Sequence, residues 1–175
     1  MKPFKSLVVT QQPVDRLWVT VRDRMPELAA MLDDIQRITV IERQTLPAGG
    51  LRLVNEWRAT PRLPVSIESV TGTDAFVWLD HAEWNESDRR CHWRIEPQFL
   101  DGRIQCQGVT LYEPAMGGRG SRVTFEGTLH MAAPRAGAAS LLERSVAPIV
   151  ESIVTVMIPK NFRKIVEAAA RLDPQ

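Results

Sequence analysis

Hydrophobic and polar residues alternate with a period of two through most of the chain, which predicts a fold built mainly from β-strands. Residues 4–11 are rich in Val and Thr and predict a first strand. Residues 35–59 alternate on both sides of a turn at residues 47–50 and predict a hairpin. Further alternating stretches, separated by turns, lie at residues 76–86, 90–98, 103–116 and 122–132. Together these stretches predict about seven strands in an antiparallel sheet.

A spacing of three and four residues between apolar positions predicts helices in the rest of the chain. Residues 14–21 and 26–32 predict two short helices directly after the first strand. Residues 140–169 predict a long C-terminal helix with one apolar face and a kink at Pro159. Residues 60–73 contain prolines that cannot donate to a β-ladder, so we expect a connection there that covers the entrance of a cavity. The expected fold class is α+β.

Composition and charge exclude several classes of protein. The chain has 175 residues, of which 44% are apolar and 25% charged, and this predicts a single domain over residues 1–175. A formal net charge of +1 argues against nucleic acid as a partner. The apolar run from Leu7 to Val9 is too short for a signal peptide, and no stretch is long enough for a stable membrane anchor. We therefore expect a cytoplasmic protein.

The cysteines and histidines do not form a metal-binding pattern. Cys91 and Cys106 have inward parity but do not face each other across the predicted turn, so we expect two reduced thiols in the core. His81, His92 and His130 have outward parity and lie on separate predicted strands. We expect no metal site and no cofactor.

The order of the predicted elements resembles the helix-grip fold of the START-like superfamily, which includes lipid-transfer domains, polyketide cyclases and aromatases, and pathogenesis-related allergens. The resemblance depends on the opening strand with residues 12–18, on the meander around Trp78 and Trp93, and on residues 161–167 of the last helix. It implies a seven-stranded sheet that curls around the C-terminal helix and leaves a hydrophobic cavity between them. Members bind lipids, sterols, polyketides or hormones there, and a minority are enzymes.

Aromatic residues gather on the inward faces of the predicted strands. Trp57, Trp78, Trp84 and Trp93 share the inward parity, and Phe125 has it on the last strand. Their large, rigid rings suit the walls of a pocket for an amphipathic ligand. The alternative interpretation is that the rings fill the core between sheet and helix.

Polar residues on the same faces indicate a site more strongly than the aromatic residues do, because a buried polar group costs about 1–3 kcal/mol unless it is paired. They are Glu42, Asn55, Asp80, Thr110 and Tyr112. If residues 47–50 close the first hairpin, Glu42 lies opposite Asn55, and a hydrogen bond between the two side chains satisfies both. Burial of Asp80 raises the pKa of its carboxyl, which suits an acid or base, whereas a bulge or a position at the sheet rim leaves it hydrated.

The sequence thus predicts binding of a hydrophobic or amphipathic small molecule, such as a lipid or polyketide, in a cavity between the sheet and the last helix. The candidate ligand contacts are Trp57, Trp78, Asp80, Trp93, Tyr112, Phe125 and Asn55. One alternative is a cyclase-like or aromatase-like enzyme that uses Asp80 and Tyr112 for proton transfer, although no sequence motif identifies them as catalytic. Another is a protein-interaction module with a collapsed cavity. Either a monomer or a homodimer formed through an exposed strand edge fits the pattern.

Overall fold

The computed structural model describes residues 2–59, 77–98, 104–132, 151 and 156–172. Its strands are β1 (Lys2–Thr10), β2 (Ile35–Thr45), β3 (Leu51–Ala59), β4 (Val77–Asn85), β5 (Arg90–Pro97), β6 (Ile104–Ala115) and β7 (Gly120–Met131). Its helices are α1 (Val14–Asp23), α2 (Met25–Ala29) and α5 (Ile158–Leu172), with short 3₁₀ turns at Pro47–Gly49 and Met116–Gly118. The predicted start of the last helix at residue 140, the connection at residues 60–73 and the turn predicted between the stretches 90–98 and 103–116 lie outside the described residues.

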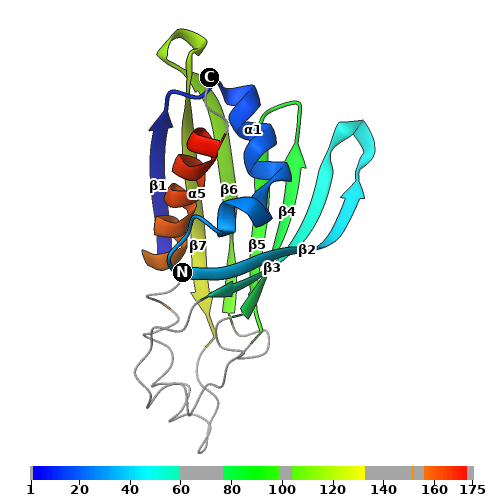
Figure 1. Ribbon diagram of the computed structural model, residues 1–175. Coiled ribbons are helices and arrows are strands. Elements are labelled where there is room, and N and C mark those ends of the chain that lie inside the picture. The colour runs from blue at the N-terminus through cyan, green and yellow to red at the C-terminus, as the bar shows by residue number, and fades with distance from the viewer. Residues whose placement is uncertain (1, 60–76, 99–103, 133–150, 152–155, 173–175) are drawn as a thin grey trace, which may run out of the picture.

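Within the described residues, the seven strands form one antiparallel sheet in the order β1-β7-β6-β5-β4-β3-β2. Helices α1 and α5 lie across the same face of this curled sheet, with β1 at one edge and the β2–β3 hairpin toward the other (Figure 1). Helix α5 packs against β1, α1 and α2. The predicted α+β class, with two short helices after the first strand and a helix gripped by the sheet, is confirmed.

The core lies between the inner face of the sheet and the helices, because each element presents one apolar face to it. Helix α1 buries Leu17, Trp18 and Val21 at helical spacing, and α5 buries Ile165 and Val166. A large apolar side chain that is fully buried contributes about 1.5–3 kcal/mol to stability. Burial of these faces therefore holds α1 and α5 over the sheet.

The turn between β4 and β5 attaches to α1 through Glu86. The indole Nε1 of Trp18 donates a hydrogen bond to Oε1 of Glu86 at 3.1 Å, and Arg22 forms an ion pair with the same carboxylate. Arg89 donates to the other oxygen of Glu86 at 2.5 Å, and its guanidinium lies 5.5 Å from the centre of the Trp18 ring. Glu86 therefore joins a turn of the sheet to the helix that closes one end of the core.

Helix α5 is irregular near Pro159, where the sequence predicts a kink. Val156 and Met157 have π-helical geometry, and the α-helix begins at Ile158, one residue before Pro159. Proline has no N–H to donate and its ring crowds the preceding turn, so a widened turn is a common accommodation. The following residues continue as a regular helix to Leu172.

Strand β2 contains a bulge that corrects one expectation. The register shifts between Val40 and Glu42, so Asn55 pairs with Val40, and Glu42 pairs with Val54. Because a bulge adds one residue and inverts the alternation, Glu42 lies on the outer face and is exposed. The predicted hydrogen bond between Glu42 and Asn55 is therefore wrong. The same inversion lets Arg43 donate to Asp23 at the end of α1, at 3.0 Å, although the alternation of the sequence places Arg43 outward.

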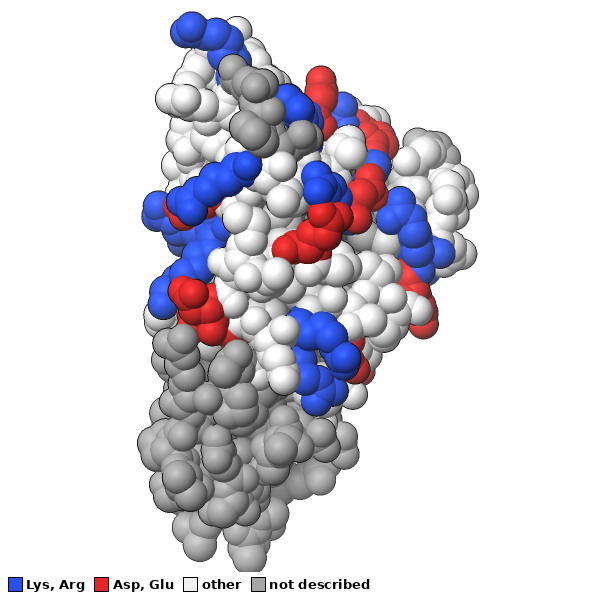
Figure 2. Space-filling model, in the orientation of Figure 1, with Lys and Arg blue, Asp and Glu red and all other residues white. Residues whose placement is uncertain are grey.

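Over the described part of the surface in Figure 2, charged side chains of both signs are interspersed and form no extended patch of one sign. Among the described residues, no helix is both long enough and apolar enough to cross a membrane.

Candidate functional site

A cavity of about 70 Å³ lies between the inner face of the sheet and the three described helices. Helix α1 contributes Val21, α2 contributes Met25, and α5 contributes Ile158, Asn161, Phe162 and Ile165. The inward side chains of the sheet complete the wall: Trp57, Trp78, Asp80, Ala82, Trp84, Cys91, Trp93, Ile95, Thr110, Tyr112 and Phe125. The cavity therefore has a mostly apolar, strongly aromatic lining with a few polar groups.

The aromatic rings of the wall are packed against one another in stacks. Trp57 and Trp78 stack across β3 and β4, with ring centres 5.6 Å apart and planes within 20°. Phe125 stacks with Trp93 on one side at 4.6 Å and with Phe162 of α5 on the other at 4.5 Å. Such contacts add about 0.5–1.5 kcal/mol per pair beyond burial. The stacks hold the rings in defined positions.

Two glycines allow the Trp93 ring to lie against the sheet. The register places Trp93, Gly108 and Gly127 side by side on β5, β6 and β7. A Cβ on Gly127 would lie 2.5 Å from the Trp93 ring, and one on Gly108 would also lie inside normal contact distance of the ring. Neither position has room for a side chain, so this part of the cavity wall depends on glycine.

Asp80 is the only acidic or basic residue that lines the cavity among the residues described. Strand β4 pairs with β3 and β5 on both sides of Asp80 without a register shift, so Asp80 lies neither at a bulge nor at the rim of the sheet. The side chain is half-buried. Burial raises the pKa of Asp80 from 3.8 to about 6, while a hydrogen bond from Asn55 and the nearby Trp57 indole lower it in part. Asp80 therefore changes charge near neutral pH.

Several buried polar groups of the wall have no hydrogen-bond partner among the described residues. They are the indole Nε1 of Trp84 and Trp93, the Tyr112 hydroxyl, and both amide atoms of Asn161. Each of these residues is under 9% exposed. An unpaired buried polar group costs about 1–3 kcal/mol. The cavity can therefore accept a molecule that offers hydrogen bonds as well as apolar surface.

The structure does not join Asp80 and Tyr112 as a hydrogen-bonded pair. Asp80 pairs with Ile95, and Ile95 pairs with Cys106, which precedes Tyr112 by six residues on β6. Burial, with a smaller contribution from the charge of Asp80, raises the pKa of Tyr112 well above its usual value, so its hydroxyl stays protonated. Any proton transfer between these two residues would need a molecule between them.

Both cysteines are buried free thiols on the inner face of the sheet. Burial raises the pKa of Cys106 to about 12 and also raises that of Cys91. Because the thiolate is the reactive form, these side chains act as small apolar groups.

Six of the seven candidate contact residues line the cavity: Trp57, Trp78, Asp80, Trp93, Tyr112 and Phe125. The seventh, Asn55, is not among the lining residues but donates a hydrogen bond to Asp80, which is. Asn161 is missing from the candidates that the sequence suggests, although a signal is present. It lies three residues after Ile158 and four before Ile165, in the apolar stripe of the helix, where a polar side chain is out of place.

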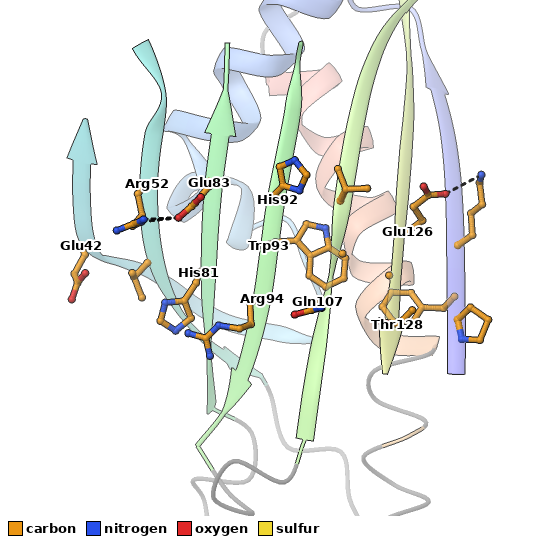
Figure 3. Close-up of a pocket in the computed structure, with 17 residues that line it drawn as sticks. Glu42, Arg52, His81, Glu83, His92, Trp93, Arg94, Gln107, Glu126 and Thr128 are labelled. Carbon is orange, nitrogen blue, oxygen red and sulfur yellow. Dashed lines mark hydrogen bonds and ion pairs between the residues drawn. The ribbon is translucent and has the colours of Figure 1, made fainter. Parts of the chain in front are cut away.

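A larger hollow of about 1240 Å³ lies on the opposite, outer face of the sheet (Figure 3). Its charged side chains largely neutralise one another. Arg52 pairs with Glu83 at 2.6 Å, and Lys5 pairs with Glu126 at 3.1 Å. His81 and His92 line it on different strands, and the described residues contain no cluster of three or more His, Cys, Asp or Glu suited to a metal ion. This hollow is broad and solvated, so the inner cavity is the better candidate site.

No protein-family model matches this sequence, and no curated protein matches it. Solved structures do match. TTHA0849 from Thermus thermophilus has a TM-score of 0.68 at 16% identity and covers 99% of this chain and 100% of its own. The Zhui aromatase/cyclase from a Streptomyces species has a TM-score of 0.61 at 11% identity, covering 98% and 96%. Norcoclaurine synthase from Thalictrum flavum has a TM-score of 0.54 at 11% identity, covering 98% and 85%.

These identities are low, so the similarity concerns the fold. The strand order, the curled sheet and the helix that it encloses define the same architecture in this chain. The protein has the helix-grip fold.

Proposed function

We propose that this protein binds a hydrophobic or amphipathic small molecule in the cavity between the sheet and α5. The observation that carries the proposal is the lining, in which stacked aromatic rings alternate with buried polar groups that have no partner among the described residues. A core that only fills space has no need for these polar groups, because each one lowers stability when unpaired. A ligand with apolar surface and a few hydrogen-bonding atoms offsets that cost.

The volume of the cavity sets a condition on the ligand. About 70 Å³ is well below the roughly 300–1,000 Å³ typical of pockets for drug-sized molecules. A larger ligand must displace part of the wall, and Phe162 is the side chain best placed to move, because it is half-buried and belongs to a helix and not to the sheet. We expect binding to reorient Phe162 away from Phe125.

A second candidate function is catalysis of the cyclase type, with Asp80 as the acid or base. Two of the similar structures are named as an aromatase/cyclase and a synthase, so the fold is compatible with enzymes. The observation that favours it here is a pKa of about 6 for Asp80, since a general base works best with a pKa near the working pH. Tyr112 would then serve as a hydrogen-bond donor to the bound molecule.

The first test is native mass spectrometry of freshly purified protein, followed by organic extraction and identification of the released compound. A retained small molecule supports the proposal and names its chemical class. Tryptophan fluorescence titrations with lipids and polyphenols complete the test for the emptied protein.

We expect Trp78→Ala to weaken binding at least about tenfold, because Trp78 lines the cavity, and Val19→Ala, at an exposed position of α1, to leave it unchanged. A protein that carries nothing and responds to nothing in the panel is instead the interaction module with a collapsed cavity.

A further inference from the structure

The charge inside the cavity is unbalanced among the residues that the structure describes. Around Asp80, β3 presents Asn55 and Trp57, which are uncharged. Strands β5 and β6 present Cys91, Cys106 and Tyr112, all of which stay protonated because burial raises their pKa values. The residues of α1, α2 and α5 that line the cavity are apolar or, at Asn161, an amide. No described lysine, arginine or histidine lines the cavity with Asp80.

A carboxylate in such a place is a recognition element for a cation. Charged groups removed from water are normally paired, because an isolated buried charge is costly. The surroundings of Asp80 are aromatic, with Trp57 and Trp78 stacked on neighbouring strands and Trp84 and Trp93 in the same wall. The faces of aromatic rings attract cations, most strongly those of tryptophan. A carboxylate and several indoles around one cavity therefore favour the same kind of ligand group.

We infer that the ligand is an organic amine, whose protonated nitrogen pairs with the carboxylate of Asp80 while the aromatic wall holds its hydrocarbon part. This inference rests on the proposed function and specifies the ligand class for the same cavity. The hydroxyl of Tyr112 and the amide of Asn161 remain available for oxygen atoms elsewhere on the molecule. A compact amine suits the small volume.

The test compares three probes that share one ring and differ in charge: benzylamine, benzyl alcohol and benzoate. Binding to the full chain is followed by intrinsic tryptophan fluorescence and by calorimetry near neutral pH. We expect benzylamine to bind about tenfold more tightly than benzyl alcohol, and benzoate to bind weakest, since it repels Asp80. We expect Asp80→Asn to remove the preference for the amine and to leave the affinity for the alcohol nearly unchanged.

The matched control is Asp88→Asn, because Asp88 is exposed in the turn between β4 and β5 and outside the cavity lining. A pH series on the unaltered protein gives a second measurement that does not depend on the folding of a variant. Affinity for benzylamine must fall as the pH drops below about 6, where Asp80 takes up a proton, while affinity for benzyl alcohol stays constant.

The outcomes separate the two proposals. If benzyl alcohol binds as tightly as benzylamine, or if Asp80→Asn leaves their ratio unchanged, the inference about amines is overturned and the proposed binding function stands. If none of the three probes binds but the protein retains or binds another small molecule, only the inference about amines fails; if the protein also carries no small molecule and responds to none of the lipids and polyphenols, both proposals fail.

Discussion

Asn55 donates a hydrogen bond from Nδ2 to Oδ2 of Asp80 at 3.3 Å, directly across the β3–β4 pair. A hydrogen bond to the charged carboxylate favours that form, whereas burial favours the neutral acid. Burial is the larger effect, and the pKa of Asp80 is about 6. Asn55 thus limits how far burial can suppress the charge in the cavity.

Removal of this hydrogen bond should raise the pKa of Asp80 further. We expect Asn55→Ala to move it above 6, because burial then acts with less opposition. The measurement is an NMR titration of the side-chain carboxyl carbon of Asp80. The control is Asn85→Ala, at an exposed position at the end of β4, which should leave the titration of Asp80 unchanged. An equal or lower pKa in Asn55→Ala would show that the hydrogen bond does not stabilise the charged form.

The same carboxyl should make the stability of the protein depend on pH. Because the pKa is raised on folding from 3.8 to about 6, the folded protein binds this proton more tightly than the unfolded chain. The contribution of Asp80 to the free energy of unfolding is therefore fully present below about pH 4, is lost as the pH rises to about 6, and changes no further above that.

We expect Asp80→Asn to abolish this loss of unfolding free energy between about pH 4 and pH 6. The loss amounts to about 2 kcal/mol when the partial exposure of Asp80 is taken into account. Urea unfolding at a series of pH values, followed by tryptophan fluorescence, measures it. Asp88→Asn, at an exposed turn position, should retain the dependence of the unaltered protein. A parallel pH dependence in Asp80→Asn and the unaltered protein would contradict the raised pKa.

The glycines beneath Trp93 predict that shortening the Trp93 side chain will restore part of the stability lost when one of them is replaced. Gly127→Ala should lower the free energy of unfolding by about 2–3 kcal/mol, because its Cβ would lie 2.5 Å from the Trp93 ring. In a Trp93→Leu background the added cost should fall by about 1 kcal/mol, since the contact with the ring is removed while the backbone oxygen of Gln107, 2.7 Å from the added Cβ, remains. Denaturant unfolding of the four proteins of this double-mutant cycle gives the coupling.

Gly108→Ala serves as the comparison for this cycle. The atom nearest to a Cβ added at this position is the backbone oxygen of Glu126, and removing the Trp93 ring leaves that contact in place. The rescue by Trp93→Leu should therefore be smaller at Gly108 than at Gly127. If Trp93→Leu restored stability equally at both positions, contact with the Trp93 ring alone would explain why both positions need glycine.

Glu86 should matter more than other surface carboxylates, because three side chains meet on it. Glu86→Ala removes the acceptor for Trp18 and the ion pairs with Arg22 and Arg89, and we expect a loss of about 1–2 kcal/mol. Glu83→Ala, which loses only an exposed pair with Arg52, should cost under about 1 kcal/mol. Hydrogen exchange of the amides in α1 should quicken in Glu86→Ala and not in Glu83→Ala.

The alternation of the sequence determined which residues of most strands point inward. Parity alone places Trp57, Trp78 and Trp93 on the inner face, and all three line the cavity. Parity is a local property, because successive side chains of a strand point to opposite faces whatever the strand pairs with. The helical spacing of the apolar residues in α1 and α5 was informative for the same reason.

The tertiary structure decided which residues contact one another at the site. The bulge in β2 turned Glu42 outward, and the strand order placed Asn55 of β3 next to Asp80 of β4. Packing of α5 against the sheet brought Asn161 to the same cavity from a distant part of the chain. Register, bulges and helix placement depend on contacts between segments far apart in sequence, and alternation within one strand carries no record of them. The faces of the elements were therefore readable from the sequence, whereas the hydrogen bonds and charges of the site required the folded chain.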